Sequence, residues 1–186
     1  SCAAGVIAAL DRELPPILKE IRHPILPEPC FNFGTIAGGI KTNVIADRCS
    51  FTIDRRTIPG ERTEEVIEQV RTIADRALLG TGAQVTVKAE MVVEASEVSP
   101  DLPIIDECKR AMAKVVDMEP LLGGGGGFTD AHWFTNDLGI PTVIFGPWYL
   151  HFGDGSISDI PDEYNYIEDI ITGTTVYAHL IANIIG

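Results

Sequence analysis

Positive charge is scarce in this sequence, which has 14 lysines and arginines against 27 aspartates and glutamates among 186 residues. The formal net charge of -13 excludes the basic surface that nucleic-acid-binding proteins present, and an anionic membrane surface repels such a chain. No apolar run approaches the roughly 20 residues of a membrane span. Residues 1–10 lack the basic start of a signal peptide. We therefore expect a cytoplasmic protein without nucleic-acid or membrane partners.

Cysteine is scarce as well, with only four in the chain. No two of them form a C-x-x-C pair, and none has zinc-finger spacing. A disulfide framework is not expected in a chain of this length with so few cysteines. Hydrophobic residues make up 45% of the sequence, which is enough to build a buried core in one or two domains.

The first half of the sequence alternates between helical and extended patterns. Pro15 and Pro16 fall inside the first helical pattern and predict a kink or a break there. In the second extended stretch, alternation places Phe51, Ile53 and Arg55 on one side. The expected elements are a helix over Ala3–Ile21, strands over Phe31–Ala37 and Cys49–Arg56, a helix over Glu61–Leu79 and a strand over Gln84–Val93.

This order predicts a two-layer α+β unit with an antiparallel sheet. A ferredoxin-like unit begins with one more strand, and that strand is missing here. The second half reads as a short αβαβα run, too small to be a complete α/β domain and typical of the closing section of a larger one. We place the boundary between the two domains after residue 97, which gives domains 1–97 and 98–186. The expected elements are helices over Ile104–Val116, Thr129–Leu138 and Ile167–Ile185, with short strands over Pro120–Leu122 and Pro141–Phe145.

A run of five glycines, Gly123–Gly127, precedes Phe-Thr-Asp-Ala-His. It is not a phosphate-binding loop, because no Gly-Lys-Ser/Thr follows and no dinucleotide-binding fingerprint surrounds it. Glycines let the backbone approach a ligand closely, and Thr129 or Asp130 is suited to cap the helix that follows. The run is therefore either a ligand-contacting turn or a flexible turn before a capped helix.

Asn43 and Arg56 form a second candidate feature. Arg56 ends a predicted strand at a turn, where its guanidinium can hold a carboxylate with two hydrogen bonds. Asn43 precedes that strand, and we expect it to lie one strand away, close enough to share a ligand. The alternative for Arg56 is a surface ion pair with Asp54.

The third feature is an acidic loop, residues 146–164, which follows the expected strand Pro141–Phe145. Loops at the carboxyl ends of parallel strands carry the active sites of α/β enzymes. The carboxylates of this loop and His151 are ligands that a metal ion could use. The alternative is a solvated acidic loop.

Four motifs in this order resemble one family, the zinc-dependent aminoacylases and carboxypeptidases that include acetylornithine deacetylase, succinyl-diaminopimelate desuccinylase and glutamate carboxypeptidase. The motifs extend over nearly the whole chain. They are GTIAGGIKTNVIADRCSFTIDRRTIPGE, similar to the family's lid segment with its Asp-x-Arg and Pro-Gly-Glu; GGGFTDAHWF, similar to Gly-Gly-Thr-Asp-Ala-Arg; GIPTVIFGP, similar to the next strand and loop; and PDEYNYIEDI, similar to Pro-Asp/Asn-Glu-Tyr/His-x-x-Ile.

The resemblance implies a lid or dimerisation domain followed by the C-terminal part of a catalytic α/β domain. It implies hydrolysis of the amide bond of an N-acyl amino acid or small peptide, with two zinc ions, or cobalt or manganese, that polarise the carbonyl and activate a water. It also implies a homodimer, for which Phe31–Ala37 and Glu61–Leu79 are the candidate contacts. The substrate-binding residues that it implies are Asn43, Arg56, Gly127, Thr129 and Asp130.

The sequence departs from the family at the metal. The family's other zinc ligands and its general base belong to motifs that precede this stretch, so we expect the chain alone to be inactive and to bind zinc weakly. The last zinc ligand of the family is a histidine, and Asp159 stands in its place. Aspartate can bind zinc through oxygen, and His151 is a candidate substitute. The alternative function is a non-catalytic dimerisation or binding module.

Overall fold

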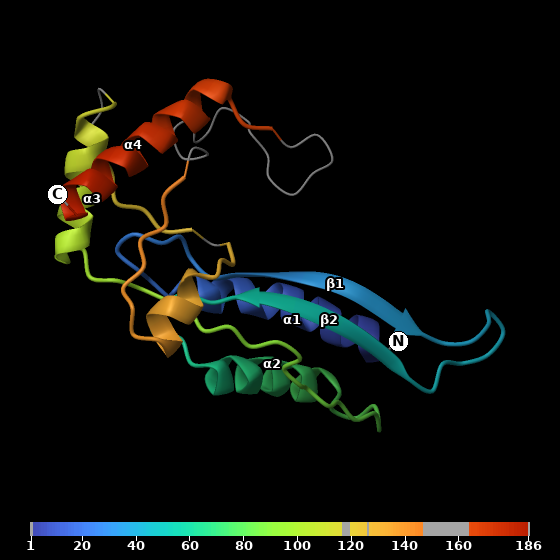
Figure 1. The fold of residues 1–186 in the computed structure, drawn as a ribbon. Helices are drawn as coiled ribbons and strands as arrows, with labels where there is room; N and C mark the ends of the chain where they lie inside the picture. The colour runs from blue at the N-terminus through green and yellow to red at the C-terminus, as the bar shows by residue number, and fades with distance from the viewer. Residues whose placement is uncertain (1, 117–119, 126, 147–163, 186) are drawn as a thin grey trace. The chain divides into compact units, whose positions relative to one another are not determined.

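The structure is a computed structural model that describes residues 2–116, 120–125, 127–146 and 164–185. The chain divides into two compact units (Figure 1). The first unit contains Ser1–Ser96 together with Gly123–Thr129, and the second contains Glu97–Leu122 and Asp130–Gly186. None of the helices in the described part of the chain is long and apolar enough to cross a membrane.

The first unit contains an antiparallel hairpin of β1 (Cys30–Gly38) and β2 (Cys49–Arg56). Both expected strands are confirmed, the second to the residue. The register shifts between Phe33 and Ile36, which marks a bulge in β1. Gly34 lies in this bulge, and a Cβ there would come within 2.8 Å of the Thr52 hydroxyl. Glycine is therefore required at this close approach.

Helices α1 (Cys2–Leu18) and α2 (Thr63–Ala77) pack with the hairpin through one hydrophobic cluster (Figure 1). The helical residues of the cluster recur at spacings of three and four, so each helix turns a single apolar stripe inward. Leu10 and Leu14 are completely buried at its centre. The sheet contributes the alternate side chains that point to this face, which are Phe31, Phe33, Phe51 and Ile53.

A kink or a break was expected at Pro15 and Pro16, and the break is wrong, because α1 continues through both prolines to Leu18. Each proline removes one hydrogen bond to a carbonyl four residues earlier, and here these carbonyls belong to the exposed residues Asp11 and Arg12, where water can reach. Leu14 and Leu18, one on each side of the prolines, are both buried. Packing on either side therefore keeps the segment helical.

The strand expected over Gln84–Val93 is also wrong. Residues 82–89 have no regular secondary structure, although Val85 and Val87 still pack against the hydrophobic cluster. The alternation of apolar residues was thus a correct sign of one-sided burial, but a strand also needs a neighbour for its backbone hydrogen bonds. The described sheet contains β1 and β2 alone.

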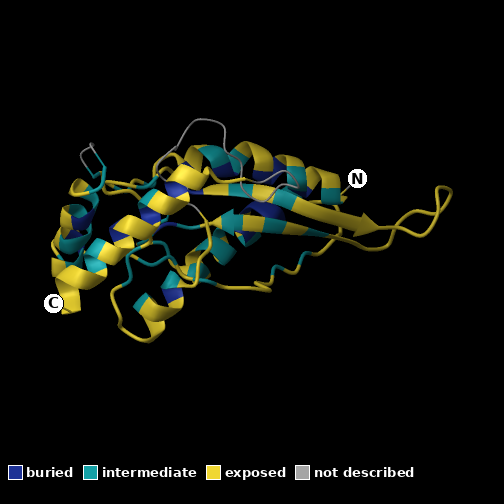
Figure 2. Cartoon of the chain, turned by 45° about the horizontal axis from the view of Figure 1, so that its top comes forward, coloured by how far each residue is buried: buried dark blue, intermediate teal, exposed yellow. Residues whose placement is uncertain are grey.

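The outer half of the hairpin extends beyond the cover of the helices (Figure 2). Every residue from 34 to 50 is exposed, whereas Phe31, Phe33, Phe51 and Ile53 are partly buried nearer the base. The loop of residues 39–48, which joins the strands, begins with Gly39 at a positive φ of 78°. The hairpin therefore has a packed base and an uncovered tip.

The second unit contains α3 (Pro103–Ala113), a short π-helix η1 (Trp133–Asp137) and α4 (Ile167–Ile185). The three expected helices are confirmed in type, and α4 also in its bounds. The expected strands Pro120–Leu122 and Pro141–Phe145 are wrong, because these residues have no regular secondary structure. The described residues of this unit offer them no strand partner, so their apolar character does not lead to a ladder.

Candidate functional site

Arg56 is the last residue of β2 and lies opposite Cys30 of β1. Its Nε and Nη2 atoms donate to Oδ2 of Asp54 at 3.0 and 2.8 Å. The pair is solvent-accessible, with side-chain exposures of 46% for Arg56 and 54% for Asp54. One carboxylate oxygen of Asp54 thus binds one edge of the guanidinium. The Nη1 atom can still donate a hydrogen bond to a ligand carboxylate.

Arg55, the preceding residue, points to the opposite face and is buried. Its side chain is 8% exposed and forms an ion pair with Glu61, which is 9% exposed. Nη1 of Arg55 also donates to the carbonyl of Arg56. The other carboxylate oxygen of Glu61 accepts a hydrogen bond of 2.9 Å from the amide of Ile58. Strand end and following turn are therefore joined by side chains as well as by the backbone.

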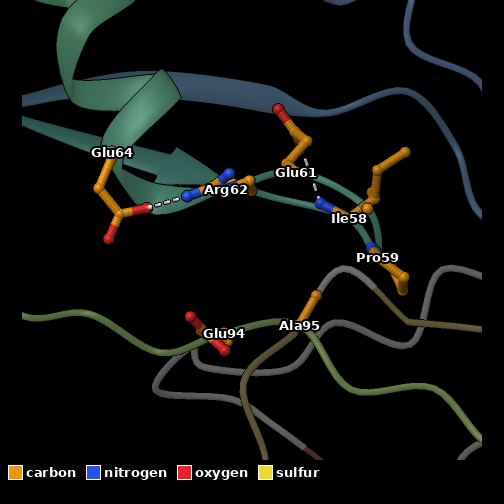
Figure 3. Close-up of a pocket in the computed structure, with 8 residues that line it drawn as sticks. Ile58, Pro59, Glu61, Arg62, Glu64, Glu94 and Ala95 are labelled. Carbon is orange, nitrogen blue, oxygen red and sulfur yellow. Dashed lines mark hydrogen bonds and ion pairs between the residues drawn. The ribbon is translucent and has the colours of Figure 1, made fainter.

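A hollow of about 430 Å³ opens beside this turn. Figure 3 shows the turn, with Glu61 beside Ile58 and the ion pair between Arg62 and Glu64. The polar lining carries three carboxylates and one guanidinium, so its character is mainly acidic. The residues around the hollow are Ile58, Pro59, Gly60, Glu61, Arg62, Glu64, Glu94 and Ala95.

Asn43 lies in the loop at the tip of the hairpin and is exposed. The register pairs Cys49 with Gly38 at the tip end and Arg56 with Cys30 at the base. Because β2 has eight residues and a strand rises about 3.3 Å per residue, the two ends of β2 are roughly 24 Å apart. The expectation that Asn43 lies close enough to share a ligand with Arg56 is therefore wrong within one chain.

The glycine run lies partly in the described chain. No described glycine of the run has a positive φ. A Cβ on Gly124 would come within 2.2 Å of Leu26 Cδ2, whereas a Cβ on Gly127 would meet nothing within 4 Å. Gly127 and Thr129 are exposed and belong to the first unit. Asp130 begins a segment of the second unit, and its carbonyl accepts a hydrogen bond of 3.1 Å from the Trp133 amide. A side chain at residue 124 would therefore require the end of the Leu26 side chain to move.

The candidate metal ligands His151 and Asp159 lie outside the described residues. Within the described residues, no group of three or more histidine, cysteine, aspartate or glutamate side chains is placed to hold a metal ion. The described residues alone therefore supply no metal centre. Burial raises the pKa of the Cys108 thiol, and the neighbouring Glu107 carboxylate raises it further. This keeps Cys108 in its unreactive protonated form.

The pair of Arg55 and Glu61 was not singled out from the sequence as functional. A signal for it was present, because the alternation of β2 placed Arg55 on the apolar side, where a charge needs a partner. The burial of His132 was not predicted from the sequence either. This residue is 7% exposed, and its ring centroid lies 4.2 Å from that of Trp133. A histidine inside the Thr-Asp-Ala-His motif was the available signal.

Comparison with known proteins identifies relatives for most of the chain. Residues 3–81 match the peptidase dimerisation domain family. The chain is 29% identical over 160 residues to acetylornithine deacetylase of Myxococcus xanthus. The aligned region covers 86% of the chain and 39% of that protein. It is 26% identical over 122 residues to an uncharacterised protein, YqjE, of Bacillus subtilis, which covers 66% of the chain and 32% of that protein. The chain thus spans less than half the length of these relatives.

Proposed function

We propose that the complete protein is a metal-dependent amidohydrolase of the aminoacylase and carboxypeptidase family that the motifs resemble, because residues 3–81 match the peptidase dimerisation domain family. Its substrate is an N-acyl amino acid or small peptide. We assign residues 1–97 to the lid or dimerisation domain and 98–186 to the C-terminal part of the catalytic domain. The break between the two structural units after Ser96 supports this assignment.

The observation that carries the proposal is the placement of Arg56. Its guanidinium is half exposed at a strand end, and Asp54 orients it from one edge. A guanidinium with one edge held by a protein carboxylate can offer its remaining donors to the carboxylate of a substrate. N-acyl amino acids carry such a carboxylate next to the amide bond that is cleaved. Arg56 is accordingly the substrate anchor, and it binds but does not react.

The other candidate residues have roles in the complete protein. Asn43 and the segment with Gly127, Thr129 and Asp130 contact the substrate away from Arg56. Because Asn43 lies in the loop at the tip of the hairpin and Arg56 lies at the base end of β2, they do not bind the same carboxylate within one chain. Zinc, or cobalt or manganese in its place, is the proposed metal, with Asp159 or His151 as the ligand from this chain. The metal would supply a polarised carbonyl and an activated water.

The activity itself is tested with the complete protein and N-acetylornithine, followed by a panel of other N-acylated amino acids. We expect release of the free amino group, loss of this release after chelation and recovery when zinc, cobalt or manganese is added back. Amide analogues that lack the free carboxylate should react more slowly, because Arg56 then has no anion to bind. A pure, metal-loaded protein that hydrolyses none of the panel would instead favour a non-catalytic dimerisation or binding module.

We also propose a homodimer that forms through β1 and α2. The outer edge of β1 has no strand partner in the described sheet, and such an edge is a template for pairing with a second chain. Ile36 lies on β1 and is 62% exposed. A lysine at this position would place a charge on the pairing edge, which natural sheets use to prevent association.

We therefore expect Ile36→Lys to raise the Kd of the dimer by at least about tenfold, equal to about 1.4 kcal/mol. The measurement is light scattering on the 186-residue chain over a range of concentrations. Ile45→Lys is the matched control, because Ile45 is 96% exposed in the loop between the strands and should leave the dimer intact. A monomeric unsubstituted chain at high concentration, or equal effects of the two variants, would contradict the proposed interface.

A further inference from the structure

Two adjacent arginines end β2 in opposite environments. Arg55 is 8% exposed and Arg56 is 46% exposed. Burying a guanidinium is costly unless its charge and its donors are matched, and apolar residues of similar volume often stabilise a fold as well or better. Among the described residues, no hydrogen-bond partner faces the buried Nε of Arg55. Fold stability alone therefore does not explain an arginine at this inward position.

The side chain of Arg55 contacts the Arg56 backbone on one side and the turn after it on the other. One Nη atom of Arg55 donates to the Arg56 carbonyl, and the other donates to Glu61. Glu61 accepts from the Ile58 amide at 2.9 Å, and the Glu61 amide donates back to the Ile58 carbonyl at 3.2 Å. The turn therefore closes on itself, with the buried side chain of Ile58 beneath it.

We propose that Arg55 and Glu61 are positioning residues for Arg56. They fix the Arg56 backbone and the start of the turn, so that the Arg56 guanidinium keeps one orientation toward the substrate carboxylate. Neither residue touches the substrate. Arginine is needed at position 55 because its planar fork bonds a carbonyl and a carboxylate at once in fixed directions, which a lysine cannot reproduce. This inference rests on the proposed role of Arg56 as the substrate anchor.

The test compares three changes in the complete protein with N-acetylornithine as the substrate. Glu61→Gln leaves one carboxamide oxygen for the two hydrogen bonds that the carboxylate now accepts. The double variant Arg55→Met/Glu61→Leu removes both charges and keeps the interior apolar, so it remains folded if the single variant does not. Glu64→Gln is the matched control, because Glu64 is 78% exposed on the same hollow.

We expect the double variant to unfold at a denaturant concentration close to that of the unsubstituted protein, while its KM rises at least about tenfold and kcat changes less. A lost positioning contact weakens binding in the ground state and the transition state alike, which raises KM selectively. Amide hydrogen exchange at Ile58 should become faster in Glu61→Gln and in the double variant. Glu64→Gln should change none of these quantities.

Three negative results have different meanings. If Arg56→Lys raises KM but the folded double variant does not, Arg56 stands as the anchor and the positioning role is overturned. If Arg56→Lys itself leaves KM unchanged, both the anchor and the positioning role are overturned. A double variant with normal KM and faster exchange at Ile58 would show that the pair only stabilises the turn, which also overturns the inference.

Discussion

Replacing Arg56 by lysine in the complete protein should lower kcat/KM by about tenfold to a thousandfold, which corresponds to roughly 1.4–4 kcal/mol of transition-state binding. Lysine keeps the positive charge but offers a rotating ammonium in place of a planar fork. At Arg56 one edge of the fork is already taken by Asp54. An ammonium drawn to Asp54 would have no second edge with fixed direction for the substrate.

Folding stability should hardly change in the same variant. The pair of Arg56 and Asp54 is about half exposed, and exposed pairs contribute at most about 1 kcal/mol. Both kcat/KM and the free energy of unfolding are therefore measured on the same preparation of the variant. Arg62→Lys is the control, because Arg62 is 71% exposed near the same turn and its contacts with Glu64 and Glu65 are long, at 3.9 and 4.0 Å. Unchanged kinetics in Arg56→Lys would remove Arg56 from the site.

The second large effect concerns the core of the first unit. Leu14→Ala should lower the free energy of unfolding of this unit by about 2–5 kcal/mol, because the side chain is completely buried and its loss leaves a cavity. Pro15 and Pro16 follow directly and remove two backbone hydrogen bonds from this part of the helix, so packing by Leu14 matters more here. Leu79→Ala is the control, since Leu79 is 78% exposed just after α2 and should change stability by less than about 0.5 kcal/mol.

The measurement must separate the two units, because a chain with two units need not unfold in one step. Both tryptophans, Trp133 and Trp148, come after residue 130 in the sequence. Tryptophan fluorescence therefore follows the second unit, whereas circular dichroism follows both. Leu14→Ala should shift the circular dichroism transition more than the fluorescence transition. A loss below about 1 kcal/mol would mean that α1 does not form the centre of this core.

Periodicity predicted the elements whose structure is decided locally. The bounds of β2 and α4 follow from alternation and from helical spacing. Periodicity failed where a distant partner decides. Val85 and Val87 alternate as a strand does and reach the core, yet the segment lacks a neighbour for its hydrogen bonds. The pattern of apolar residues in a segment predicts which side chains are buried. Whether the segment forms a strand depends on a partner strand from another part of the chain.

The candidate site shows the same division. Arg56 could be placed at a strand end from the sequence, because the strand and the turn after it are local features. The distance between Asn43 and Arg56 could not, because it depends on the register of the hairpin, which pairs Arg56 with Cys30 at the base. The pairing of Arg55 with Glu61 depends on how the turn between them closes. A bulge such as the one at Gly34 likewise becomes visible only when both strands are present.

Because the tip of the hairpin is uncovered, the conformational entropy that ligand binding would remove differs between the two ends of β2. At the base, side chains that pack on the helices keep the backbone ordered in the absence of a ligand. At the tip, residues 34–50 are all exposed, and local opening there has a low free energy. Ordering each mobile residue costs about 1–2 kcal/mol of conformational entropy. Under the proposed function, a contact between Asn43 and the substrate is therefore weaker than one through Arg56, because the tip must first become ordered, whereas the backbone of Arg56 is already packed at the base.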